Sequence, residues 1–294
     1  MDFLLIGIST LLIMLVAGNN TSAIVGVLIA SKMLNKNLSL LLAIFGYIIG
    51  LLAQGIDLKN ASAKLFPNSS VLIFALVITL SLFLMANIWG VPLSLTMALV
   101  GTAYGFSLHY HYSIPYIYLI IEAWIIAPVL SLVISYLINS IILNRKFSHV
   151  WNYTSTIKLS LIVISFFTAY TLGANTIGFI VDIVGFNFLE IGAACIGIVV
   201  GTFLLSKSTI RTVGEKMYLM KYISAFSSQL ISAILVEIAT FLSIPLSNTQ
   251  TLTASVLGAG LSYKSKIINI RPFLFIVLMW FLSPLLGAIL AFLV

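Results

Sequence analysis

Long runs of apolar residues, separated by short polar stretches, fill this chain from one end to the other. The runs are predicted to be helices, because they lack the alternation of lipid-facing and inward-facing residues that marks a membrane β-strand. Several come close to the roughly 20 residues that a helix needs to cross about 30 Å of hydrocarbon. The gaps between the runs predict ten membrane segments, at residues 3–31, 38–56, 70–89, 93–108, 114–142, 157–180, 187–205, 222–243, 246–261 and 273–293.

The composition supports an all-α polytopic membrane protein and excludes several other classes. Hydrophobic residues make up 61% of the 294 positions, with only 14 Lys and Arg and 7 Asp and Glu among the rest. A soluble domain carries about a quarter of its residues as charges, so a cytosolic enzyme and a nucleic-acid binder are excluded. The single cysteine, Cys195, has no partner for a disulfide framework. The first apolar run lacks a basic leader and a small-residue cleavage site, which favours a membrane segment over a signal peptide.

The basic residues predict which way the segments run. When Lys and Arg are assigned to alternate sides of ten spans, 12 of the 14 fall on one side, and only Lys59 and Lys64 fall on the other. Because cytoplasmic loops carry the excess of basic residues, both termini are predicted to lie outside. A re-entrant pair in place of two crossings leaves this assignment unchanged, so residues 70–89 and 93–108 are either two crossings or a hairpin.

Three motifs recur in the same order in the two halves of the chain, at offsets of 155, 153 and 156 residues. Each half holds five segments, and an odd number requires the second half to enter the membrane from the opposite side. The sequence therefore predicts an inverted-topology repeat of the kind found in many secondary transporters. We assign residues 1–143 to the first repeat, 144–156 to a cytoplasmic linker and 157–294 to the second repeat. The motif pairs are residues 18–21 with 173–176, residues 91–96 with 244–249, and Trp124 and Pro128 with Trp280 and Pro284.

The first pair of motifs, Gly-Asn-Asn-Thr and Gly-Ala-Asn-Thr, places glycine and small polar residues in the middle of apolar segments. A helix breaks within the membrane only where it is buried in protein or lines a polar cavity. The ends of a broken helix offer N–H groups and a positive dipole, which hold an oxyanion without a full charge. Asn20, Thr21, Asn175 and Thr176 are therefore candidates for a substrate site. The alternative is that they only join packed helices by hydrogen bonds.

The second pair of motifs, Pro-Leu-Ser-Leu-Thr and Pro-Leu-Ser-Asn-Thr, predicts the start of a helix in each half. Proline fits the first helical turn and has no N–H to leave unpaired. A simple kink, repaired by Ser and Thr, is the alternative. All four motifs are expected to form a pseudo-symmetric ring of amides and hydroxyls near the midplane, which suits a small tetrahedral oxyanion. The second pair contributes Ser94, Thr96, Ser247, Asn248 and Thr249.

Few other residues carry candidate chemistry. Glu237 lies inside a predicted span, where an acid is costly, and we consider it for proton coupling, with Gln250 as a weaker candidate. His109 and His111 have no nearby carboxylate in the sequence, so they do not predict a metal site. The sequence contains no nucleophile–base pair, glycine-rich phosphate loop or metal cluster. It gives no support for an enzyme, and neither a metal nor a cofactor is expected.

Taken together, the motifs resemble the inorganic phosphate transporter (PiT) family, which also includes sulfate permeases. The resemblance rests on the two Gly-x-Asn motifs, the two Pro-x-Ser-x-Thr motifs, residues 212–216 and the repeated Trp-x-x-x-Pro. It implies an ion-coupled symporter, in which the family's Gly-Ala-Asn-Asp and Ser-Thr-Thr-His motifs bind the anion and its coupling cation. Asn20 and Asn175 match the family asparagine, whereas threonine replaces the family aspartate in both halves. Met97 and Gln250 stand where the family has histidine.

The sequence thus predicts a secondary active transporter of inorganic phosphate across the plasma membrane, working by cation-coupled symport and alternating access. The coupling cation is a proton or sodium, and the two missing aspartates favour a proton. The alternatives are a sulfate permease of the same fold, a passive anion channel and a non-transporting scaffold. The expected partners are phosphate or sulfate and the lipid bilayer, with no nucleic acid, and the chain acts alone or as a homodimer.

Overall fold

The computed structural model describes residues 2–30, 33–59, 61–66, 71–89, 93–144, 150–209, 222–262 and 270–294. These residues are helical apart from short connections, and no strand occurs among them, so the predicted all-α fold is confirmed. The helices are α1 (Asp2–Ala30), α2 (Lys36–Gln54), η1 (Gly55–Leu58), α3 (Ala61–Leu65), α4 (Leu72–Trp89), α5 (Leu95–His109), α6 (Tyr116–Asn144), α7 (Val150–Leu172), the π-helical turn η3 (Gly173–Ile177), α8 (Gly178–Val184), α9 (Phe188–Thr209), α11 (Tyr222–Phe241), α12 (Asn248–Leu261) and α13 (Ile270–Leu293).

Each of the ten predicted segments corresponds to a helix in the structure. Eight helical stretches are long and apolar enough to cross a membrane, so this is a multi-pass membrane protein. The other two segments are α5, with 15 residues, and α12, with 14 residues. At 1.5 Å per residue each extends only about 22 Å, short of the roughly 30 Å of a hydrocarbon core. The ten predicted segments therefore include two helices that are too short to cross.

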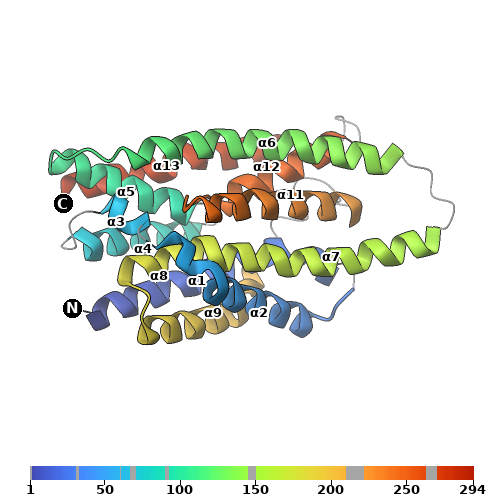
Figure 1. Ribbon diagram of the computed structural model, residues 1–294, viewed down its shortest axis with the longest axis horizontal. Coiled ribbons are helices and arrows are strands. Elements are labelled where there is room, and N and C mark those ends of the chain that lie inside the picture. Colours follow the sequence, from blue (N-terminus) through green and yellow to red (C-terminus); the bar gives the residue numbers. More distant parts are fainter. Residues whose placement is uncertain are drawn as a thin grey trace.

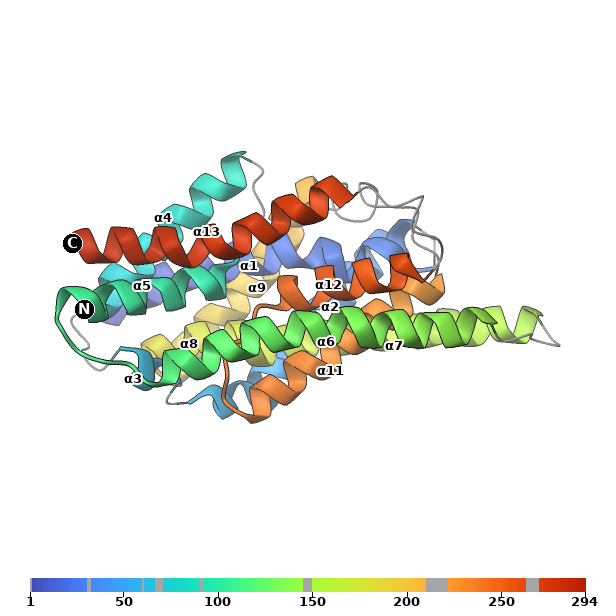
Figure 2. The same ribbon diagram turned by 90° about the horizontal axis from the view of Figure 1, so that it is seen from above.

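These two short helices lie toward opposite ends of the long axis of the molecule, and each follows a longer helix, α4 or α11 (Figures 1 and 2). The last residue of α5, His109, contacts Phe292 O near the end of α13 at 2.8 Å. Near the end of α12, Ala259 O accepts a hydrogen bond of 3.0 Å from Asn139 of α6. Both chain termini lie at the end of the molecule that holds α5, whereas α6 ends and α7 begins at the opposite end (Figure 1).

Helices of the two halves pack in exchanged pairs. Helix α1 packs against α9 while α2 packs against α7, and α5 packs against α13 while α12 packs against α6. If α1, α2, α5 and α6 are matched in chain order with α7, α9, α12 and α13, each contact maps onto its counterpart. This exchange supports the predicted inverted repeat, whose limits stay predictions. Of the predicted linker, residues 145–149 lie outside the described residues, and α7 already begins at Val150.

Glycine lets each exchanged pair come into backbone contact. In each pair, at least one glycine lies so close to the partner helix that an added Cβ would overlap a carbonyl oxygen. Between apolar helices in lipid, close packing of this kind replaces the hydrophobic effect as the source of association. The substitution of any of these glycines would therefore push two helices apart. The contacts are Gly50 with Tyr170, Gly201 with Met14, Gly105 with Ala288 and Gly258 with Leu132.

The structure corrects the helix breaks expected at the Gly-x-Asn-Thr motifs. Helix α1 continues through the first motif without interruption. Asn20 Nδ2 donates to Val16 O at 3.0 Å and Thr21 Oγ1 donates to Ala17 O at 2.6 Å, so both side chains bond to the preceding turn of the same helix. The second motif forms the π-helical turn η3 between α7 and α8. A π turn rearranges hydrogen bonds within a helix but leaves no free helix end.

Candidate functional site

Helices α5 and α12 begin beside each other, and both start as the Pro-Leu-Ser motifs predict. Ser94 is the N-cap of α5, and Ser247 is the N-cap of α12. The Ser94 hydroxyl donates to the Ser247 hydroxyl at an oxygen–oxygen distance of 2.9 Å. Ser247 shares another hydrogen bond of 2.9 Å with Thr249 Oγ1. Residues that hold equivalent places in the two motif copies thus touch where the two short helices meet.

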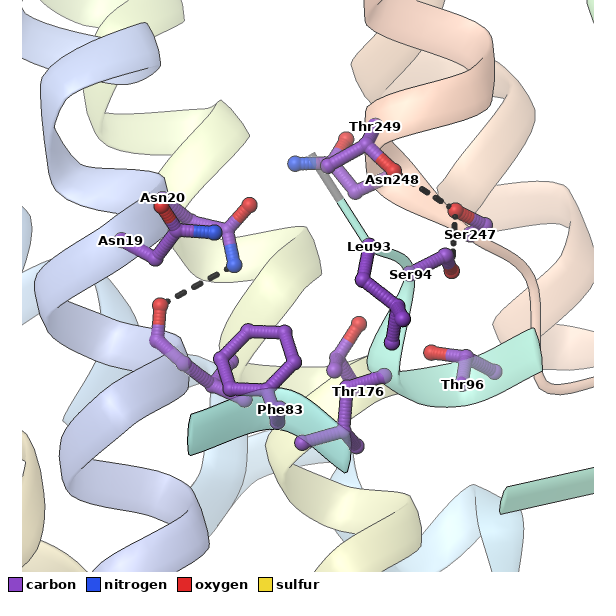
Figure 3. A pocket seen from close by; sticks show the side chains of 12 residues that line it. Asn19, Asn20, Phe83, Leu93, Ser94, Thr96, Thr176, Ser247, Asn248 and Thr249 are labelled. Atoms are coloured by element: carbon purple, nitrogen blue, oxygen red, sulfur yellow. Dashed lines mark hydrogen bonds between the residues drawn. The ribbon is translucent and has the colours of Figure 1, made fainter. Parts of the chain in front are cut away.

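A cavity lies beside this contact, between α1 and the first residues of α5 and α12 (Figure 3). Phe83 of α4 and Thr176 of the π turn also face it. No Asp, Glu, Lys, Arg or His is among its lining residues in the described part of the chain. The lining consists of Val16, Asn19, Asn20, Phe83, Leu93, Ser94, Leu95, Thr96, Thr176, Ser247, Asn248 and Thr249.

Because these lining residues are uncharged, dipoles set the electrostatics of the cavity. A helix N-terminus carries the equivalent of roughly half a positive charge, and two N-termini meet here. Hydroxyl groups of Thr96, Ser247 and Thr249 and the amides of Asn20 and Asn248 add polar groups that can donate hydrogen bonds. The combination favours an oxyanion, since helix N-termini and neutral donors stabilise negative charge.

Asn175 occupies the place in the second motif that Asn20 has in the first, but it does not line the cavity. Its side chain is fully buried. Nδ2 donates to Thr240 Oγ1 and to Ile244 O, each at 3.0 Å, and Oδ1 accepts a hydrogen bond of 2.9 Å from Leu246 N. Asn175 therefore holds the connection between α11 and α12, which places Ser247, and is a positioning residue.

The two motif threonines also differ. Thr176 lines the cavity, whereas Thr21 is not among the lining residues and lies 3.3 Å from the Tyr47 hydroxyl of α2. Seven of the nine predicted substrate-binding residues are thus brought to one cavity, and Thr21 and Asn175 are not. The symmetric ring expected from the sequence is incomplete, because each Gly-x-Asn-Thr motif contributes a different position to the lining.

Neither coupling candidate lines the cavity. Gln250 is buried on α12, and its Oε1 atom has no hydrogen-bond partner among the described residues. Glu237 is half-buried near the end of α11, where it hydrogen-bonds with the side chain of Gln54 and lies near Asp57. Gln54 also accepts a hydrogen bond of 3.0 Å from the Tyr170 hydroxyl. Glu237 thus belongs to a polar cluster beside the α11–α12 connection rather than to the cavity.

Two polar residues at the centre were not among the predicted site residues. Asn19 lines the cavity beside Asn20, and its place inside the first motif was the available signal. Ser283 of α13 accepts a hydrogen bond of 3.2 Å from Ser94 N, so it supports the start of α5. Its position next to Pro284 in the repeated Trp-x-x-x-Pro motif did not indicate this role. Within the described residues, no three His, Cys, Asp or Glu side chains group as metal ligands.

This architecture defines a class of protein. Half-helices whose N-termini meet at a polar cavity between exchanged halves are typical of secondary transporters. Comparison with known proteins then gives the family: the chain belongs to the phosphate transporter family (PHO4), whose sequence profile matches residues 16–182 and, in a second match, residues 145–291. This confirms the resemblance found in the motifs, and the family consists of transporters rather than enzymes.

The chain is similar to phosphate and sulfate permeases over two thirds or more of its length. Over 98% of its length it is 28% identical to a putative phosphate permease of Methanocaldococcus jannaschii, of which it covers 94%. It is 26% identical to a probable low-affinity inorganic phosphate transporter of Bacillus subtilis, over 69% of the chain and 66% of the relative. A sulfate permease of the same bacterium is 23% identical, over 95% of the chain and 82% of the relative. A solved sodium-dependent phosphate transporter shares the fold, with a TM-score of 0.84 and 17% identity over 99% of this chain and 97% of that one.

Proposed function

We propose that this protein is a secondary active transporter that moves inorganic phosphate across the plasma membrane by proton-coupled symport and alternating access. The observation that carries the proposal is the meeting of two helix N-termini and several hydroxyl groups at a cavity lined by uncharged residues. The names of the archaeal and bacterial relatives support phosphate as the substrate. The end of the molecule that carries both termini faces outside, in line with the distribution of Lys and Arg.

In this proposal the anion lies beside the N-caps of α5 and α12. Its oxygens accept hydrogen bonds from Thr96, Ser247 and Thr249 and from the amide of Asn20. Phosphate that carries protons also needs acceptors, which the hydroxyl oxygens and the amide oxygens of Asn20 and Asn248 supply. Because the described lining has no basic side chain, the anion is not held by a full opposite charge and can leave again.

Alternating access requires the α4–α5 hairpin and the α11–α12 hairpin to move relative to each other. The hydrogen bond from Ser94 to Ser247 links the two hairpins directly. Ser94 is the donor in this bond, so an anion that accepts the hydroxyl hydrogen of Ser94 competes with it. Binding therefore weakens the contact that joins the hairpins, which couples occupancy of the site to their separation.

Glu237 is the candidate for the coupling proton, acting through the α11–α12 connection. Its partner Gln54 lies three residues before Asp57, and Asp57 O accepts a hydrogen bond of 2.6 Å from Ser243 in that connection. Glu237 also lies one turn before Thr240, which is bonded to Asn175. A change in the protonation of Glu237 thus alters contacts of the segment that carries Ser247 to the cavity.

Sulfate is the second candidate substrate, and one observation favours it. No carboxylate lines the cavity in the described part of the chain, so the strongest acceptor for a phosphate proton is missing from the lining. Sulfate carries no proton near neutral pH and needs donors only. The similarity to the sulfate permease of Bacillus subtilis adds to this second reading.

Uptake of labelled phosphate into proteoliposomes tests the proposal, with proton and sodium gradients imposed in separate runs and unlabelled sulfate as competitor. We expect phosphate to accumulate against its gradient when protons flow inward, with little inhibition by sulfate. Accumulation driven by the sodium gradient alone would show that sodium, and not the proton, is the coupling ion. Inhibition of phosphate uptake by a low concentration of sulfate, together with uptake of labelled sulfate, would show that sulfate is the substrate. Flux without accumulation under either gradient would indicate a passive channel.

A further inference from the structure

A seam between α6, α11 and α12 carries a row of buried polar side chains. Ser131, Ser135 and Asn139 lie four residues apart on α6, share one face of that helix and are all fully buried. Asn139 Nδ2 donates to Ala259 O of α12 at 3.0 Å, and its Oδ1 accepts a hydrogen bond of 3.2 Å from Ser227 of α11. These contacts show that the face of α6 with the two serines is turned toward α11 and α12. We call this region the serine seam.

The other two helices also place polar side chains along the serine seam. On α12, Thr251 and Ser255 lie one turn apart and are fully buried. Thr251 Oγ1 shares a hydrogen bond of 2.7 Å with Ser232 of α11. Ser224 of α11 is fully buried as well, one turn before Ser227 and Ser228 in the sequence. All three walls of the seam thus contain hydroxyl groups.

Several of these hydroxyls make no hydrogen bond that would stabilise the fold. Among the described residues, the side-chain oxygens of Ser131, Ser135, Ser224 and Ser255 have no hydrogen-bond partner. A buried hydroxyl without a partner costs free energy, and in lipid-embedded protein this cost is not relieved by bulk solvent. Buried polar groups in such a position are normally satisfied by water. The unpartnered hydroxyls therefore point to water or a polar solute in the seam during the working cycle.

The serine seam connects the candidate site with one end of the molecule. At the cavity, Asn248 Oδ1 accepts a hydrogen bond of 3.2 Å from Ser232, so the first residue of α12 belongs to both the cavity lining and the seam. At the other end, Asn139 bonds with Ser262, which is partly exposed. That end is where α6 finishes and α7 starts (Figure 1).

The matching region of the other half lacks this row. At the offset of 156 residues between the Trp-x-x-x-Pro motifs, Ser131 corresponds to Gly287 and Ser135 to Ala291 of α13. At the offset of 153 residues between the Pro-Leu-Ser motifs, Ser255 corresponds to Thr102 of α5. The Thr102 hydroxyl is already bonded to Leu99 O at 2.7 Å. The polar row is therefore not a consequence of the shared architecture.

We propose that the serine seam is the route by which the anion passes between the cavity and the membrane face at which α6 ends and α7 begins. This inference rests on the proposed transport function. In the described conformation the route is closed, because its side chains are buried and Gly258 of α12 packs on the Leu132 carbonyl of α6. Separation of the α11–α12 hairpin from α6 opens it, and the hydroxyls then replace part of the hydration shell of the anion.

Cysteine accessibility tests the route without depending on flux. In a background with Cys195→Ser, we would introduce Ser135→Cys or Ser255→Cys and measure reaction with a membrane-impermeant thiol reagent added from either side of the membrane. Ala291→Cys, at the matching place of the other half, is the buried control. Leu137→Cys is a control on the side of α6 that lies at the outer surface of the protein. Tyr110→Cys, exposed at the opposite end of the molecule, identifies the opposite face.

We expect Ser135→Cys and Ser255→Cys to react at least tenfold faster than Ala291→Cys, only from the face opposite to that of Tyr110→Cys. Phosphate, or sulfate if that is the substrate, should slow the reaction severalfold. Reaction no faster than that of the control from either face would overturn the route. Fast reaction that neither anion slows would overturn it as an anion path and leave a water-filled seam. Failure of the proposed function itself would show separately, as absent uptake by the unsubstituted protein.

Discussion

Asn20 and Asn175 occupy the same place in two copies of one motif, yet the structure uses them differently. Asn20 is half-buried, bonds one turn back within α1 and faces the cavity. Asn175 is fully buried and makes three hydrogen bonds, one to Thr240 of α11 and two to the α11–α12 connection. The two threonines next to them differ in the opposite sense, since Thr176 faces the cavity and Thr21 does not. A repeated motif in this fold thus places one residue at the cavity and one in a supporting contact in each half.

The largest effect is expected for Asn175→Ala. The substitution removes both bonds to the α11–α12 connection and leaves Leu246 N and Ile244 O without this partner. We expect a loss of stability of about 2–3 kcal/mol and uptake below a tenth of the unsubstituted value, measured by thermal unfolding in detergent and by proteoliposome flux. Unchanged unfolding temperature together with normal uptake would contradict the positioning role.

Asn20→Ala should instead weaken binding with little effect on folding. The residue makes one hydrogen bond, to Val16 O of its own helix, so the expected loss of stability is below about 1 kcal/mol. Loss of one contact to the anion corresponds to about a tenfold rise in KM for phosphate. If Asn20→Ala lowers the unfolding temperature as much as Asn175→Ala does, the distinction between the two asparagines is wrong.

Glu237→Gln is expected to remove the response to a proton gradient while flux under equal pH on both sides continues. The amide keeps a hydrogen-bonding group beside Gln54 but cannot titrate. Under an imposed proton gradient, phosphate accumulation by Glu237→Gln should fall severalfold, to the level that the phosphate gradient alone produces. Glu122→Gln, an exposed acid in another spanning helix, is the matched control and should leave the response intact. Proton-driven accumulation by Glu237→Gln would remove this residue from the coupling mechanism.

The smallest effects separate the two threonines. Thr176→Val removes a hydroxyl from the cavity and should lower uptake about threefold to tenfold, the range of a neutral hydrogen bond. Thr21→Val removes only contacts with Ala17 O and Tyr47, away from the cavity, and should leave uptake within about twofold. Equal losses in the two variants would show that both halves of the ring contact the anion after all.

Much of this fold follows from the sequence, because lipid imposes strict rules on the chain. Apolar runs predicted all ten helical segments, and the Pro-Leu-Ser motifs predicted that a helix starts at each of them. The N-caps are Ser94 and Ser247, so Pro245 lies just before α12 and not in its first turn as expected. The sequence left open whether residues 93–108 cross the membrane, and the helix lengths in the structure are what identify α5 and α12 as too short. Such features depend on local composition and on the residues at helix starts, and both can be read directly from the sequence.

The details of the site depend on which way side chains turn, and the sequence pattern does not contain that information. Glycine and asparagine suggested a break in α1, but Asn20 and Thr21 bond back within the helix, which stays continuous. Asn175 was expected beside Asn20 at the substrate site, but it does not line the cavity and supports a connection about 70 residues further along the chain. Packing between helices determines these long-range hydrogen-bond partners, and a sequence motif does not predict that packing.

The most direct test of the central claim, that the cavity at the N-termini of α5 and α12 holds the anion, is a crystal structure with arsenate, analysed by the anomalous scattering of arsenic. Arsenate has the shape and charge of phosphate and marks one position. We expect one peak within hydrogen-bonding distance of Ser247 and Thr249 and beside Asn20. A peak elsewhere in the protein, with the cavity empty at saturating arsenate, would contradict the claim.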